Sequence, residues 1–96
     1  MGDLCDKINK FGKSIGNEHR YRILQSLIKG PRTVGELVDT IGLSQPAISQ
    51  HLRTLKEAEL VVDERKGQEV YYSLNTEHTL ALLTALVKDL ERSRKK

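Results

Sequence analysis

The sequence has a single cysteine, no tryptophan and no long hydrophobic run. Cys5 has no partner for an intramolecular disulfide, which excludes the scaffold of a small cross-linked secreted protein and favours a reducing compartment. No apolar run approaches the roughly 20 residues that cross a bilayer, and the N-terminus is charged where a signal peptide is apolar. We therefore expect a cytoplasmic protein without a membrane partner.

The sequence also has little material for a core. Of its 96 residues 38% are hydrophobic and 4% aromatic, and a chain this short buries only about 60–65% of its unfolded surface. We predict one domain over residues 1–96, with a second copy covering apolar surface that one copy leaves open. The net charge of +3 is only mildly basic, so it gives weak support to a nucleic-acid partner.

Amphipathic helices are predicted at both ends of the chain. Residues 3–15 carry one apolar stripe, and residues 76–92 carry more apolar surface than one stripe needs. The apolar residues of these two helices are Leu4, Ile8, Phe11, Ile15, Leu80, Leu83, Leu86, Val87 and Leu90. Between them, Asn17 is placed to cap a second helix that runs to about Lys29.

Residues 33–58 contain two short helices joined by a tight turn. Thr33 and Glu36 have the spacing of a capping box, and Gly42 ends the helix that this box opens. Ser44 then caps a further helix with Pro46 in its first turn. The apolar residues of this helix recur on one side, so its polar residues face outward. This order predicts a helix-turn-helix.

Residues 60–74 change to β-type sequence. Apolar runs at 60–62 and 70–74 flank a charged segment, residues 63–68, in which Gly67 suits a turn with positive φ. A β-hairpin with a charged tip is therefore expected directly after the helix-turn-helix. The predicted fold is mainly α with a small β-hairpin, in the order α-α-α-α-β-β-α, which is a winged helix-turn-helix.

The polar side of the fourth helix has the chemistry of DNA recognition. A helix fits the major groove, where Gln45, Ser49 and Gln50 would meet base edges, while basic residues of the helix and wing would meet phosphates. The predicted DNA contacts are Thr33, Ser44, Gln45, Pro46, Ala47, Ser49, Gln50, His51, Arg53, Lys56, Arg65, Lys66 and Gln68. No catalytic constellation accompanies them, since Ser44 acts as a cap and no carboxylate orients His51, so we expect no enzyme.

These motifs resemble the ArsR/SmtB family of transcriptional repressors. The most specific stretch is SQPAISQHLRTLKEAELV at residues 44–61, followed by GQEVYYSL in the wing at residues 67–74. The resemblance implies a homodimeric winged helix that represses a promoter by binding an inverted repeat in double-stranded DNA. It also implies that the apolar residues of the first and last helices form the subunit interface. Many such repressors respond to an inducer, and the inducer of this chain is unknown.

The metal sites of that family are poorly matched. Residues 37–39 read Leu-Val-Asp where the third-helix site has Cys-x-Cys. In the last helix His78 matches the zinc-type site, but Arg92 stands where a carboxylate is needed. We therefore expect no metal and no cofactor, and a metal-responsive repressor using His78 and Asp89 is kept as an alternative.

Charge leaves another alternative open. Residues 53–69 contain four basic side chains (Arg53, Lys56, Arg65 and Lys66) and five acidic ones (Glu57, Glu59, Asp63, Glu64 and Glu69). This stretch alone cannot attract phosphates strongly, so a winged-helix module that docks a protein instead of DNA is the rival function. His51 is equally compatible with phosphate contact and packing, and His19 is expected in solvent.

Overall fold

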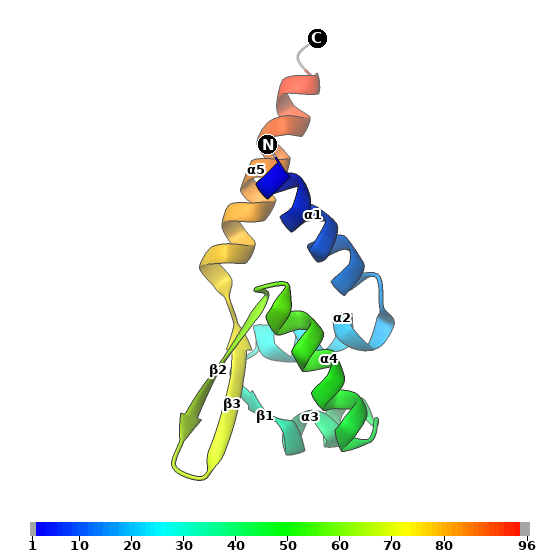
Figure 1. Cartoon of the computed structure of the whole chain (residues 1–96), viewed down its shortest axis with the longest axis vertical. Coiled ribbons are helices and arrows are strands. Elements are labelled where there is room, and N and C mark those ends of the chain that lie inside the picture. Colours follow the sequence, from blue (N-terminus) through cyan, green and yellow to red (C-terminus); the bar gives the residue numbers. More distant parts are fainter. Residues whose placement is uncertain (1, 95–96) are drawn as a thin grey trace.

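The computed structural model describes residues 2–94 and has the predicted winged helix-turn-helix architecture (Figure 1). Its elements are α1 (Gly2–Ile15), α2 (Glu18–Ile28), β1 (Arg32–Thr33), α3 (Val34–Ile41), α4 (Gln45–Glu57), β2 (Val61–Lys66), β3 (Glu69–Leu74) and α5 (Thr76–Arg94). The molecule measures 52 × 25 × 24 Å. α5 extends towards one end of it, with the start of α1 beside this helix, and α3, the start of α4 and the tip of the wing lie at the other end.

Local hydrogen bonds at the predicted caps explain where the helices begin. The Asn17 side chain accepts from the backbone N–H groups of His19 and Arg20 at the start of α2. Thr33 and Glu36 form both bonds of the capping box that opens α3. Each of these bonds satisfies a donor that the first helical turn leaves without a partner.

The turn between α3 and α4 also follows the sequence. Gly42 ends α3 with φ of +85°, a left-handed conformation that costs glycine little. Ser44 then caps α4 by accepting from the Ala47 N–H at 3.3 Å. The two helices are consequently held at a fixed angle by a three-residue connection, residues 42–44.

The hydrophobic core lies where α2, α3 and α4 meet the base of the wing. Its buried members are Ile23, Leu24, Leu27, Leu37, Ile41, Ile48, Leu52, Leu55, Leu60 and Val61. Phe11 and Ile15 of α1 pack against this cluster and are half-buried. These two side chains therefore have contacts within their own subunit, in addition to their predicted place at a subunit interface.

The sheet has three antiparallel strands in the order β1-β3-β2, one more than the sequence predicted. In β1, Arg32 pairs with Tyr72 and Thr33 with Tyr71. A strand of two residues shows no alternation of polar and apolar side chains, so it leaves no periodic signal. It joins the start of the helix-turn-helix to the central strand of the wing.

The wing strands are longer than predicted. Residues 63–68 were expected to form the tip, but β2 continues to Lys66 and β3 begins at Glu69, which leaves two residues in the turn. Gly67 takes φ of +64° there, as a tight hairpin requires. The opposite charges of Lys66 and Glu69 face each other across the strands, which favours pairing up to the tip.

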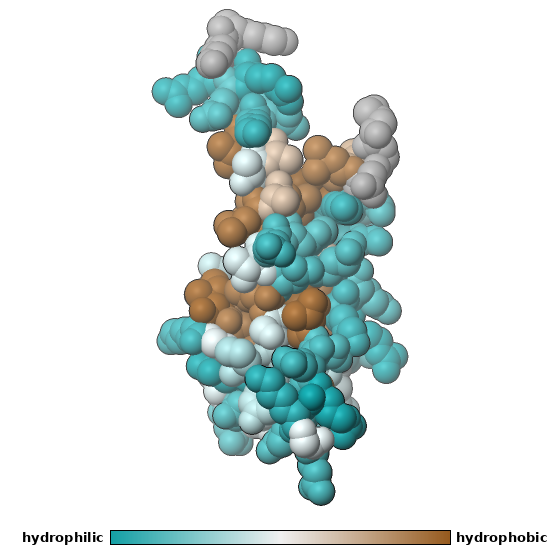
Figure 2. Space-filling model, turned by 90° about the vertical axis from the view of Figure 1, so that its left-hand side faces the viewer, coloured by the Kyte–Doolittle hydropathy of each residue, from teal (hydrophilic) through white to brown (hydrophobic). Residues whose placement is uncertain are grey.

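α5 leaves most of its apolar surface exposed, while Leu82 turns inward and is 4% exposed. Figure 2 shows the resulting hydrophobic surface, which lies below the hydrophilic C-terminal part of the helix. The large hydrophobic residues of α1 and α5 that are exposed are Leu4, Leu80, Leu86, Val87 and Leu90. Between residues 2 and 94, none of the helices combines the length and apolar character that a membrane span needs.

Candidate nucleic-acid interface

The outer side of α4 presents the predicted base-reading residues. Ile48, Leu52 and Leu55 are at most 1% exposed and hold the opposite side of the helix in the core. Gln45 and Gln50 are exposed as a result, and so are the other outward residues Ser44, Pro46, Ser49 and Arg53. Amide side chains of this kind donate to and accept from adenine in the major groove, and a serine hydroxyl bonds to either kind of group.

The cap residues Thr33 and Ser44 serve the fold and still have DNA-binding capacity. Each hydroxyl oxygen accepts a backbone N–H, from Glu36 and Ala47 respectively. A hydroxyl has one hydrogen to donate besides the lone pairs that accept. Both side chains can therefore donate to a phosphate oxygen while they cap their helices.

The wing exposes its three predicted DNA-contacting residues, Arg65, Lys66 and Gln68, at the end of the hairpin. The Lys66 ammonium lies 5.7 Å from the centre of the Tyr71 ring, close enough for a cation–π contact. In Figure 1 the hairpin projects beside α4 towards the same end of the molecule. The start of α4 and the tip of the wing are thus two separate elements on one end of the molecule.

Lys56 is less available than the sequence suggested. Its ammonium donates to Asp63 Oδ2 of β2 at 2.9 Å, and the two groups form an ion pair. The hydrogen bond to Asp63 and the carboxylate charge raise the pKa of Lys56. The predicted phosphate contact of Lys56 is consequently in competition with a carboxylate of the same chain.

Arg20 joins three helices. Its Nε donates to the Ser14 carbonyl at 2.9 Å and its second guanidinium nitrogen, Nη2, donates to the Lys13 carbonyl at 3.0 Å, at the C-terminal end of α1. A cation stabilises these carbonyls because they form the negative end of the helix dipole. Arg20 Nη1 also lies 3.5 Å from His51 Nδ1 of α4. This arginine is thus used inside the protein, and no sequence motif indicated its role.

His51 faces α2 rather than the outer side of α4. It is half-buried, and its ring centre lies 6.1 Å from that of His19. His19, which was expected in solvent, is itself half-buried because it packs here. Burial, followed by the charges of Arg20 and His19, lowers the pKa of His51 below its usual 6.5. The surroundings of His51 favour the packing interpretation, and its phosphate contact stays a prediction.

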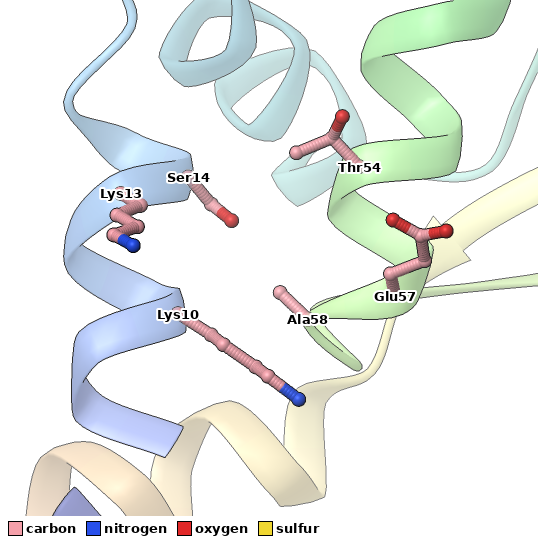
Figure 3. A pocket seen from close by; sticks show the side chains of 6 residues that line it. All are labelled: Lys10, Lys13, Ser14, Thr54, Glu57 and Ala58. Carbon is pink, nitrogen blue, oxygen red and sulfur yellow. The ribbon is translucent and has the colours of Figure 1, made fainter. Parts of the chain in front are cut away.

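A cavity of about 360 Å³ lies between α1 and the end of α4 (Figure 3). The α1 side chains that line it are Lys10, Lys13 and Ser14, and those across from them are Thr54, Glu57 and Ala58. Lys10 is also ion-paired with Asp6 at 3.6 Å. On this side of the molecule a hollow therefore separates α1 from α4, and Arg20 bonds to the carbonyls of two of its lining residues, Lys13 and Ser14.

The residues of the metal alternative lie apart on α5. His78 is half-buried near the start of the helix, in a pocket lined partly by Leu4 and Leu82. Asp89 is exposed near its end and ion-paired with Arg92. Within residues 2–94, no three His, Cys, Asp or Glu side chains come together as metal ligands would. One chain therefore gives this alternative no geometric support.

Comparison with known proteins supports the same interpretation of the fold. Residues 17–62 match the family described as bacterial regulatory protein, arsR family. The transcriptional repressor SdpR of Bacillus subtilis is 45% identical over 69 residues, which cover 72% of this chain and 77% of SdpR. The nodulation protein NolR of Rhizobium meliloti is 42% identical over 76 residues, 79% of this chain but 62% of NolR.

One solved structure adds information on assembly. It is the homodimeric winged helix-turn-helix DNA-binding domain of Mb0332 from Mycobacterium bovis, described as a possible ArsR-family transcriptional regulator. The two chains superpose with a TM-score of 0.77 at 31% identity, covering 97% of this chain and 85% of the other. The similarity thus extends beyond the helix-turn-helix to the helices at both ends of the chain.

The surroundings of His51 predict a pH dependence of stability. Because its pKa is lowered in the folded state, the unfolded chain binds more protons as the pH falls below about 6.5. The free energy of unfolding should therefore decrease between pH 7 and pH 5, and His51→Gln should flatten this decrease. Urea unfolding at several pH values measures it. The control is His78→Gln, which replaces a histidine of α5 in the same way. If the free energy of unfolding of His51→Gln falls with pH as steeply as that of the wild type, the prediction is refuted.

Proposed function

This chain belongs to the arsR family of bacterial regulatory proteins, and we propose that it is a dimeric repressor that binds an inverted-repeat operator through the major groove. Members of the family are transcriptional regulators rather than enzymes, so the chain is a DNA-binding transcriptional regulator and not an enzyme. A regulator of this kind works where the chromosome is, so we propose the cytoplasm as its location.

The orientation of α4 is the observation that carries the proposal. Its apolar stripe is fully buried, and its exposed side presents Gln45, Ser49 and Gln50. These three side chains are proposed to read bases. Arg53 and the wing residues Arg65 and Lys66 are proposed to contact phosphates, which position the protein but carry no sequence information.

The caps and the flank of α4 complete the proposed contact surface. Thr33 and Ser44 would donate their hydroxyl hydrogens to phosphate oxygens, and Gln68 would reach the backbone or minor groove from the wing turn. Pro46 and Ala47 lie in the first turn of α4, where apolar contact with a thymine methyl is possible. His51 belongs to this surface only through its ring edge, since Arg20 approaches its Nδ1.

The dimer is proposed from the exposed apolar side chains of α1 and α5. Leu80, Val87 and Leu90 are 59%, 50% and 62% exposed in one subunit, and burying such side chains against a second copy is favourable by about 25 cal/mol per Å². The proposed interface consists of Leu4, Ile8, Phe11, Ile15, Leu80, Leu83, Leu86, Val87 and Leu90. A two-fold dimer matches an operator whose half-sites form an inverted repeat.

Fluorescence anisotropy with labelled duplexes tests the DNA proposal. We expect binding to a random duplex at low salt that weakens as salt increases, and tighter binding to a sequence selected from a random pool. Few phosphate contacts predict a shallow dependence on salt. If no duplex binds even at low salt, the protein-docking alternative replaces this proposal.

Gln50→Ala tests base reading by α4. The variant should lose about 1–3 kcal/mol of binding free energy for the selected operator and tolerate other bases at one position of each half-site. Because Gln50 is exposed, the thermal stability should not change. Binding of a randomised operator library measures the base preference. If the variant shows the same base preferences across the library as the wild type, Gln50 does not contact a base.

Val87→Glu tests the subunit interface. Val87 is 50% exposed in the single subunit, so a carboxylate there leaves the monomer fold intact but would be buried unpaired in the proposed dimer. We expect sedimentation to show a monomer with much weaker operator binding. Lys88→Gln is the control, because it makes the same change of net charge on the neighbouring residue. A Val87→Glu protein as dimeric as this control would contradict the interface.

A further inference from the structure

A small cup separates α4 from the wing. It has a volume of about 240 Å³ and is lined by Ser49, Leu52, Arg53, Lys56 and Tyr72. Leu52 closes its floor, being 1% exposed, while Arg53 and Lys56 supply two positive charges. A water molecule occupies about 30 Å³ in the liquid, so the cup has room for a phosphate group between the two elements proposed to bind DNA.

Asp63, on the edge strand β2, does not line the cup but is ion-paired with Lys56, which does. It is the cross-strand partner of Tyr72, so both side chains lie on one face of the sheet. Its carboxylate holds Lys56 Nζ at 2.9 Å, and the two side chains are 30% and 54% exposed. The neighbouring carboxylate, Glu64, pairs with Tyr71 instead and points to the opposite face. Of these two adjacent acids, Asp63 is therefore the one that holds a residue of the cup.

We propose that the cup of Arg53, Lys56 and Tyr72 is a binding site for one DNA backbone phosphate, and that Asp63 restrains DNA affinity by competing with this phosphate for the Lys56 ammonium. The inference rests on the proposed DNA-binding function and assigns a specific role to an acidic wing residue. When a phosphate enters, Lys56 either leaves Asp63 or is shared with it. This competition acts on every duplex alike, because phosphates are the same in every sequence.

Asp63→Asn is the test. It keeps the size of the side chain, removes the charge and releases Lys56. Since an exposed ion pair is worth up to about 1 kcal/mol, the dissociation constant should fall about two- to fivefold at low salt. The slope of log affinity against log salt should steepen by up to about 0.9, the value for one more phosphate contact. The same gain is expected for the selected operator and for a random duplex.

Two further variants separate this mechanism from general repulsion. Glu64→Gln removes the same charge one residue away on the other face of β2, and it should tighten binding less than Asp63→Asn does. In a Lys56→Met background, Asp63→Asn should give little or no gain. Thermal unfolding of each variant checks that the fold is kept.

The outcomes are distinguishable. Equal gains from Asp63→Asn and Glu64→Gln, or a gain that persists in the Lys56→Met background, would overturn the competition at Lys56. If the wild type binds duplexes and Asp63→Asn binds them no more tightly, this inference alone is overturned. A wild type that binds no duplex would overturn the proposed function as well.

Discussion

Burial of one stripe of α4 is the constraint on which the proposed recognition surface depends. Ile48, Leu52 and Leu55 are at most 1% exposed, and burying each is worth about 1.5–3 kcal/mol. Turning the helix by one residue, about 100°, would take this stripe out of the core. Ser49 and Gln50 face outward because the apolar side chains of the same helix are held in the core. Leu60 and Val61 belong to the same core, so the base of the wing is fixed by the same packing.

Features that depend on neighbouring residues could be predicted from the sequence. The caps at Asn17, Thr33 and Ser44 bond to backbone groups two or three residues away, so the chain alone contains all that they need. Gly42 ends α3 for an equally local reason. In the candidate site, the cap and the apolar stripe of α4 were enough to predict which residues face outward, because the apolar stripe of an amphipathic helix packs against the core.

Features that depend on distant contacts could not be predicted. β1 exists because Arg32 and Thr33 pair with β3 some forty residues along the chain. The ion pair of Lys56 with Asp63 requires the relative positions of α4 and β2. In the sequence Lys56 and Asp63 are two separate charges of residues 53–69, whereas in the structure they form one ion pair. The role of Arg20 follows in the same way from three helices meeting, which no spacing along the sequence encodes.

Arg20 links the end of α1 to α4, and in the proposed dimer α1 also carries part of the subunit interface. In that dimer the link would carry the position of the two-fold axis to α4, the helix proposed to enter the groove. Equivalent major grooves on one face of DNA are separated by about 34 Å, so a small tilt of α4 relative to the axis puts the second half-site out of phase with its helix. A side chain bonded to the carbonyls of Lys13 and Ser14 would thereby help to set the spacing between half-sites that the proposed dimer can span.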